Sequence, residues 1–149
     1  MPTRDSVRTV LDRKGSSVFH IAPEAPVFEA LEIMAQHDVG ALLVISGAQL
    51  CGVFSERDYA RKIILHGKAS RDTPVGEIMS SPPIVVDPDH TVEDCLRLMS
   101  RHRIRHLPVV DHGAVIGFLS IGDLVNWTIH SQEAEISHLN HYIMGSYPA

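Results

Sequence analysis

The chain has 149 residues, 44% of them hydrophobic, and a formal net charge of −5 at pH 7, which suits one ordinary globular domain. It contains no run of lysine and arginine, which argues against a protein that binds nucleic acid or a membrane surface through a positive patch. No apolar stretch approaches the roughly 20 residues that cross a bilayer, and the first ten residues lack the apolar segment of a signal peptide. We therefore expect a cytoplasmic protein.

The first 66 residues predict a lead-in helix followed by one β-α-β-β-α unit. The helix after Pro26 has apolar residues at the i, i+3, i+4 and i+7 spacing of a single helix face, namely Val27, Ala30, Leu31 and Met34. Two apolar runs around a short turn then predict a hairpin of largely buried strands. In chain order, the expected elements are a helix at 7–11, a strand at 18–21, a helix from 27, strands at 41–45 and 50–54, and a helix beginning near 56.

The same pattern recurs 65 positions later without a gap. Residues shared by the two copies include Pro23, Val27, Gly52, Ser55 and Asp58, which correspond to Pro88, Val92, Gly117, Ser120 and Asp123. After a linker at 67–74, the second copy predicts a helix at 75–79, a strand at 84–86, a helix from 92, strands at 107–110 and 115–119, and a helix from 121. The fold class is therefore α/β (α+β), built from tandem repeats that pack as a pseudo-twofold pair. The seam between the repeats is the natural place for a ligand.

The last helix is longer than the repeat requires. It is expected to run to about Ile143, with an apolar face at Trp127, Ile136, Leu139 and Ile143. A monomer would leave that face exposed to water, so we expect a homodimer. The expected division of the chain is a lead-in helix at 1–17, repeat 1 at 18–66, a linker and lead-in helix at 67–82, repeat 2 at 83–130 and a helical extension at 131–149.

The sequence predicts neither a catalytic site nor a metal site. Ser55 and Ser120 have no base nearby in the sequence, and no pair of acids has catalytic spacing. His102 and His106 are four positions apart, but they straddle the end of a helix and the start of a strand, so they do not share one face. The cysteines at 51 and 95 are not spaced as metal ligands, and we expect both to be reduced and buried.

Both copies run from their last strand into a helix through Ser-x-x-Asp, at Ser55–Asp58 and Ser120–Asp123. This pattern has two interpretations. In the first, the serine and aspartate only cap the helix, as in a capping box. In the second, the free N–H groups of the helix N-terminus bind a phosphate, while the aspartate accepts hydrogen bonds from the hydroxyls of a ribose. The repetition of the motif at equivalent places favours a pair of nucleotide pockets.

Taken together, these features resemble the paired cystathionine-β-synthase (CBS) domain proteins, also called Bateman modules. The resemblance covers about residues 18–125 and the lead-in segments. Three features carry it: Pro-x-x-x-Val at the first helix of each copy, Ile-Arg-His-Leu-Pro-Val-Val-Asp at 104–111, and the two Gly-x-h-Ser-x-x-Asp endings, where h is an apolar residue. The resemblance implies that the sheets pack into one module with a pocket on each side, that modules dimerise as flat discs, and that the ligand is AMP, ADP, ATP, NAD(H) or S-adenosylmethionine.

The resemblance also implies which residues line the two pockets. The pocket of the second motif would be built from Ser120, Gly122, Asp123, Arg105, His106, Lys14, Phe19, Val39 and Gly40. The pocket of the first motif would be built from Ser55, Arg57, Asp58, Met79, Ser80, Ile84, Ile104 and Arg105.

The two pockets should differ in chemistry. Arg105 and His106 would bring charge-assisted bonds to a phosphate in the Asp123 pocket, whereas Glu56 offsets the charge of Arg57 in the other. The Asp123 pocket is therefore expected to bind a mononucleotide more tightly. The functional interpretation is a non-catalytic sensor that binds an adenine nucleotide and acts on an unidentified partner protein. The alternative is a ligand-free dimerisation scaffold in which both motifs only cap helices.

Overall fold

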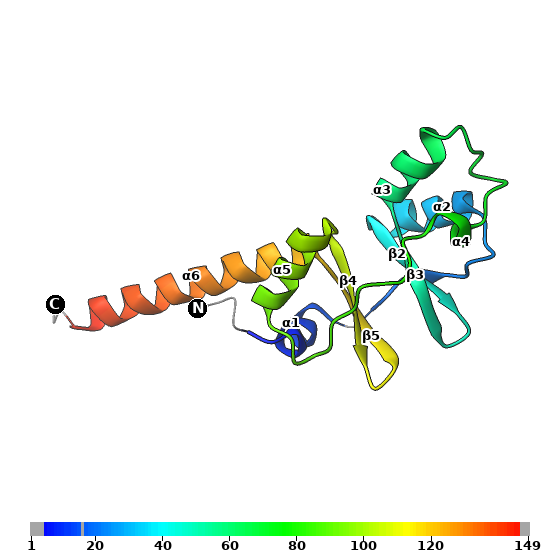
Figure 1. The fold of residues 1–149 in the computed structure, drawn as a ribbon. Helices are drawn as coiled ribbons and strands as arrows, with labels where there is room; N and C mark the ends of the chain where they lie inside the picture. The colour runs from blue at the N-terminus through cyan, green and yellow to red at the C-terminus, as the bar shows by residue number, and fades with distance from the viewer. Residues whose placement is uncertain (1–4, 16, 147–149) are drawn as a thin grey trace.

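The computed structural model describes residues 5–15 and 17–146, and both halves have the predicted lead-in helix, the helix before the hairpin, and the hairpin. In chain order, the elements are α1 (Val7–Lys14), β1 (His20–Ile21), α2 (Val27–His37), β2 (Ala41–Ser46), β3 (Gln49–Ser55), α3 (Glu56–Asp58), the π-helix η2 (Tyr59–Ile64), α4 (Val75–Ile78), α5 (Val92–His102), β4 (His106–Asp111), β5 (Ala114–Ser120) and α6 (Ile121–Ser146). The two halves lie side by side, with their strands toward the middle and most helices outside, and α6 projects away from the body (Figure 1).

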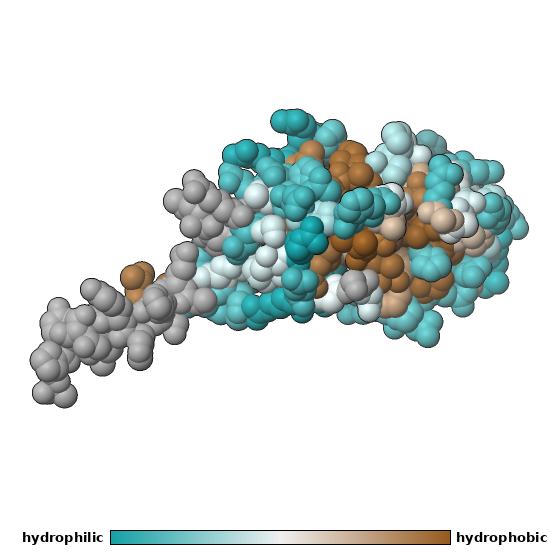
Figure 2. Space-filling model, turned by 90° about the horizontal axis from the view of Figure 1, so that it is seen from below, coloured by the Kyte–Doolittle hydropathy of each residue, from teal (hydrophilic) through white to brown (hydrophobic). Residues whose placement is uncertain are grey.

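The strands of the two halves pair in the same way. The antiparallel pair β2–β3 sets Ala41 against Ser55, and β4–β5 sets His106 against Ser120 at the equivalent position. Both hairpins carry a register irregularity at the same place, four residues into β2 and β4. Figure 2 shows apolar side chains gathered across the middle of the body, over these strands. The repeat read from the sequence is therefore a repeat of backbone pairing as well.

The two sheets differ in their first strand. In the first half, β1 pairs in parallel with β2 and completes a three-stranded sheet. In the second half, the strand predicted at 84–86 is reduced to a single parallel bridge between Val86 and Val109. In the first half, Leu43 N donates to the carbonyl oxygen of Phe19 at 3.1 Å, but the equivalent residue of β4 is Pro108, and proline has no N–H to donate to a ladder. The prediction of a full strand here is wrong.

Each short lead-in helix packs on the opposite half of the chain. Helix α1 precedes the first repeat, yet Val7, Val10 and Leu11 belong to the core of the second, with Val92 and Leu107. Helix α4 precedes the second repeat, yet its residues Val75 and Ile78 belong to the core of the first, with Val27, Leu42 and Phe54. The two halves have therefore exchanged their lead-in helices, and neither core is complete without the other half's segment.

The same backbone hydrogen bonds hold the two exchanged segments. At α1, the donors Val7 N and Arg8 N bond to the carbonyl oxygens of His90 and Pro88, at 2.7 and 3.0 Å. At α4, the equivalent donors Val75 N and Gly76 N bond to the carbonyl oxygens of Ala25 and Pro23, both at 2.8 Å. A third bond, also at 2.8 Å, runs the other way in each half, from Val92 N to Asp5 O and from Val27 N to Thr73 O.

Two equivalent glycines make room for the exchanged segments. A Cβ atom on Gly52 would lie 2.6 Å from the backbone oxygen of Ser80, and one on Gly117 would lie 2.6 Å from Cδ2 of Leu11. Both distances are too short for real contacts. The backbone oxygen of Ser80 cannot rotate away, whereas the leucine side chain can shift.

We predict that Gly52→Ala lowers the free energy of unfolding by about 1–3 kcal/mol, the usual cost of overpacking. Gly117→Ala should cost less, because the atoms that it meets belong to a side chain. Gly122→Ala is the control, since its Cβ would lie 3.5 Å from the nearest atom, Oγ of Ser120. Denaturant unfolding of the three variants checks this order. Equal stability of Gly52→Ala and Gly122→Ala would contradict the close approach at β3.

Candidate functional site

Both Ser-x-x-Asp motifs cap their helices. The Oγ atom of Ser55 accepts a hydrogen bond from Asp58 N at 3.3 Å, and Oδ2 of Asp58 accepts one from Ser55 N at 3.0 Å. At the second motif, Ser120 Oγ accepts from Asp123 N at 3.1 Å, and Asp123 Oδ2 accepts from Ser120 N at 2.8 Å. The capping interpretation is confirmed at both positions, and any role in ligand binding is additional to it.

Asp58 is a buried carboxylate that several neighbours hold in place. It is only 7% exposed. Besides the backbone of Ser55, its oxygens accept from Ser55 Oγ at 3.1 Å and from Ser80 Oγ at 2.9 Å, and Lys62 Nζ lies 3.2 Å away. Lys62 also donates to the carbonyl oxygen of Ile78 at 3.0 Å. Asp58 therefore joins the start of α3 to η2 and to the segment that follows α4.

Asp123 has a different partner, the ammonium group of Lys14 at the end of α1. Lys14 Nζ lies 2.7 Å from Asp123 Oδ2 and also donates to the carbonyl oxygen of Phe118. This ion pair borders a small pocket of about 250 Å³. The pocket is lined by Val10, Arg13, Lys14, Asp123, Asn126, Trp127 and His130.

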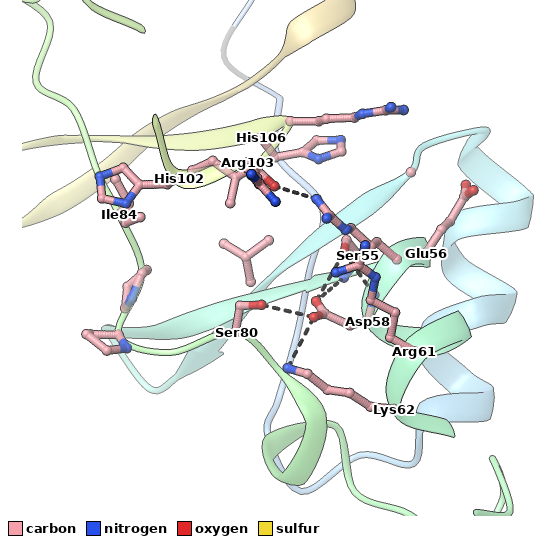
Figure 3. A pocket seen from close by; sticks show the side chains of 17 residues that line it. Ser55, Glu56, Asp58, Arg61, Lys62, Ser80, Ile84, His102, Arg103 and His106 are labelled. Carbon is pink, nitrogen blue, oxygen red and sulfur yellow. Dashed lines mark hydrogen bonds and ion pairs between the residues drawn. The ribbon is translucent and has the colours of Figure 1, made fainter. Parts of the chain in front are cut away.

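A large cavity, with a volume of about 970 Å³, lies beside Asp58 (Figure 3). It is bounded by α3 and η2 of the first half, by the segment after α4, and by the end of α5 and the start of β4 in the second half. Its lining is Gly40, Val53, Ser55, Glu56, Arg57, Asp58, Arg61, Lys62, Ser80, Pro82, Pro83, Ile84, His102, Arg103, Ile104, Arg105 and His106.

The structure brings together most residues assigned to the first motif's pocket. The residues of this set that line the cavity are Ser55, Arg57, Asp58, Ser80, Ile84, Ile104 and Arg105. Met79 does not line it, because its side chain packs against the first core beside Gly52.

The structure divides the residues assigned to the second motif's pocket. Gly40, Arg105 and His106 line the large cavity beside Asp58. Lys14 and Asp123 line the small pocket. Phe19 and Val39 pack on the first core, where Phe19 stacks on His37 with ring centroids 3.9 Å apart. Ser120 and Gly122 lie at the start of α6, outside the linings of both pockets. The prediction that these residues form one pocket does not match the arrangement.

The large cavity is strongly cationic. Five of its lining residues are arginine or lysine, and two are acidic, although the whole chain has a net charge of −5. Three of these cations, Arg61, Lys62 and Arg103, were not among the residues expected from the sequence to line a pocket. A signal for Arg61 existed, because Arg57 and Arg61 are spaced i, i+4 after the capped start of a helix and so share a face. A cavity of this charge suits an anionic ligand.

Arg57 connects the two halves across this cavity. Its Nη1 atom donates to the carbonyl oxygen of Arg103 at 2.5 Å (Figure 3). Arg103 ends α5 in the left-handed conformation, with φ of 55°. The guanidinium of a first-half residue is thus bonded to the second half at the cavity itself.

His106 lies at the seam between the halves. Gly40 is its neighbour in the first half, since a Cβ atom there would lie 3.8 Å from the imidazole. The ring centroid of Phe118 is 5.5 Å away. Burial lowers the pKa of His106 to about 4 from its ordinary value of 6.5. The imidazole is therefore neutral at pH 7, and it cannot supply the charge-assisted phosphate bond that the sequence analysis assigned to it.

His106 should make the protein less stable in mild acid. Its pKa is lower in the folded chain than in the unfolded one, so protonation favours unfolding, and stability falls as the pH drops from 6.5 toward 4. From pH 7 to pH 5, this group should cost up to about 2 kcal/mol. His106→Gln should lose that part of the pH dependence, whereas the control His112→Gln, at a 94% exposed side chain, should keep it. Parallel pH profiles for the wild type and His106→Gln would contradict this account.

The family model for the CBS domain matches the chain twice, at residues 7–65 and 75–130. The chain is 38% identical over 151 residues to the CBS domain-containing protein CBSX3, mitochondrial, of Arabidopsis thaliana, covering 95% of this chain and 73% of that protein. It is 34% identical over 137 residues to the CBS domain-containing protein YhcV of Bacillus subtilis, covering 89% of this chain and 97% of the relative.

A solved structure shares the fold. The crystal structure of the CBS domain NE2398 superimposes with a TM-score of 0.81 at 46% sequence identity, covering 84% of this chain and 98% of the other. The agreement extends over both repeats, since 84% of this chain is covered, which is more than one repeat holds.

Proposed function

Because the chain belongs to the CBS-domain family, we propose that it is a non-catalytic regulatory module that binds an adenine nucleotide in the cavity beside Asp58. The candidate ligands are AMP, ADP, ATP and NAD(H). The observation that carries the proposal is the gathering of five arginine and lysine residues around one cavity between the repeats, in a chain of negative net charge.

The lining of the cavity offers a partner for each part of a nucleotide. Arg61 and Arg105 are exposed cations that would hold phosphate oxygens. Asp58 would accept hydrogen bonds from the ribose hydroxyls, which would take over positions that Ser80 Oγ and Ser55 Oγ now fill. Ile84 and Ile104 are the partly buried apolar residues against which a base would pack.

Under this proposal, the two pockets rank in the opposite order of nucleotide affinity from the one expected from the sequence. The tighter site was expected at Asp123, on the basis of Arg105 and His106. Those residues line the other cavity, His106 is neutral, and Asp123 already pairs with Lys14. A ligand at Asp123 would have to compete with that ion pair inside a much smaller pocket, so we assign the principal site to Asp58.

Ligand binding would be transmitted through the contact between Arg57 and Arg103. The Arg57 guanidinium donates a hydrogen bond to the carbonyl oxygen of Arg103 and so joins the two halves at the cavity. A bound phosphate would compete with that carbonyl oxygen for the guanidinium. The ligand can shift the module only by its difference in affinity for the two arrangements. The output would then pass to a partner protein, with the module acting as a homodimer.

We predict that an adenine nucleotide binds the full chain in isothermal titration calorimetry, and that Arg105→Gln weakens it about tenfold or more. The reason is that hydrogen bonds to charged groups contribute about 1.5–3 kcal/mol, and 1.4 kcal/mol is tenfold in affinity. Arg101→Gln is the matched control, because Arg101 is exposed on the same stretch of chain but does not line the cavity. Equal losses in both variants would contradict a specific site.

A ligand-free dimerisation scaffold remains the second candidate function. The observation in its favour is that both motif carboxylates already have partners within the chain, Asp58 with Ser80 and Lys62, and Asp123 with Lys14. A thermal-shift screen separates the two functions, because a ligand that binds only the folded chain raises its melting temperature. A shift with AMP, ADP, ATP, NAD, NADH or S-adenosylmethionine supports the sensor, and no shift with any of them supports the scaffold.

A further inference from the structure

Helix α6 carries an apolar face that its own body does not cover. Leu124 is fully buried in the second core, and Trp127 Nε1 donates to Oδ2 of Asp5 at 2.8 Å, so this side of the helix faces the body. On the other side, Val125, Ile129, Ile136 and Leu139 are 45%, 48%, 59% and 58% exposed. The family model ends at residue 130, and the helix continues outward beyond it (Figure 1).

The spacing of this face follows a heptad repeat. With Ile129 at an a position, the face occupies alternating d and a positions at Val125, Ile129, Gln132, Ile136, Leu139 and Ile143. The side chains of Glu135, Ser137, Asn140 and Ile143 lie outside the described residues, and their heptad positions come from the sequence. Five of the six positions are apolar, with isoleucine at every a position and valine or leucine at two of the three d positions. A 3.5-residue period matches a second helix of the same period.

We propose that the occupant of this face is α6 of a second copy of the chain, in a parallel and in-register two-stranded coiled coil. Isoleucine at a with leucine at d is the pattern that favours parallel dimers, and Ile136 and Leu139 follow it. The inference deepens the homodimer part of the proposed function and is independent of the nucleotide.

The positions of the charged residues select the parallel arrangement. After Asp123, the only charged Asp, Glu, Lys or Arg residues of the sequence are Glu133 and Glu135. In the parallel register, Glu133 at e neighbours Thr128 at g of the other copy, and Glu135 at g neighbours Asn140 at e. Each acid therefore meets an uncharged polar residue.

An antiparallel pair would bring like charges together. When the apolar faces of two antiparallel helices overlap over their full length, Ile129 of one helix lies opposite Leu139 of the other, and Gln132 lies opposite Ile136. In that register, Glu133 of one helix lies beside Glu133 of the other. The two Glu135 residues are also neighbours, and both pairs lie near the centre of the coiled coil. Repulsion between these acids opposes the arrangement.

The test is disulfide formation between identical positions in the full chain. Leu139→Cys places a cysteine at a d position, where parallel helices bring the two Cα atoms within the 4.4–6.8 Å range of a disulfide. In the antiparallel pair, the same atoms would be about 15 Å apart along the axis, at 1.5 Å per residue. Cys51→Ser removes the half-buried native thiol, whereas Cys95 can stay, because it is buried and burial raises the pKa of its thiol to about 12.

Ser137→Cys is the matched control, because it lies two residues away at a b position, off the face. Under oxidised glutathione, we expect at least tenfold more cross-linked dimer from Leu139→Cys than from Ser137→Cys. Adding Ile136→Asp to the Leu139→Cys variant should remove the cross-link while leaving the melting temperature of the body unchanged. Val125→Cys repeats the experiment at a d position next to the body.

The outcomes separate this inference from the wider proposal. Selective cross-linking at both d positions supports the parallel coiled coil. A dimeric mass by light scattering with no selective cross-link overturns the coiled coil and leaves the homodimer standing. A monomeric mass for the intact chain at micromolar concentration overturns both. Nucleotide binding, measured on the same samples, is unaffected by any of these results.

Discussion

The exchange of the two lead-in helices is the constraint on which the rest of the structure depends. Leu11 of α1 fills the core of the second half, and Ile78 of α4 fills the core of the first. A unit of this size is only marginally stable by itself, and each core is completed by the segment that precedes the other half. The exchange therefore fixes the halves side by side, and the cavity beside Asp58 forms where they meet.

The exchanged segments also make the two motif sites different. The segment after α4 presents Ser80, whose hydroxyl bonds to Asp58, whereas α1 ends in Lys14, whose ammonium pairs with Asp123. At Asp58, a ligand hydroxyl can replace the hydroxyl of Ser80 while the ion pair with Lys62 stays in place. At Asp123, the lysine comes from the exchanged segment itself and lines the small pocket beside the carboxylate. Two nearly identical caps thus come to lie beside cavities of different size, about 970 Å³ at Asp58 and about 250 Å³ at Asp123.

Features that depend on local sequence pattern could be predicted from the sequence. Features that depend on packing between distant segments could not. The hairpins and the caps at Ser55 and Ser120 follow from spacing of a few residues, and the structure has them. The lead-in exchange depends on contacts such as Arg8 N to Pro88 O, and no local pattern says which half a short helix joins. Gly40 and His106 lie at the seam, so packing decides which cavity they line, and no local pattern in the sequence shows it.

A crystal structure of the chain grown with an adenine nucleotide tests the central claim most directly, that the cavity between the exchanged halves is the ligand site. The account predicts the ribose hydroxyls on Asp58, the phosphates beside Arg61 and Arg105, and Arg57 moved from the carbonyl oxygen of Arg103 toward the phosphates. A nucleotide bound at Asp123 with Lys14 displaced, and none beside Asp58, would contradict it.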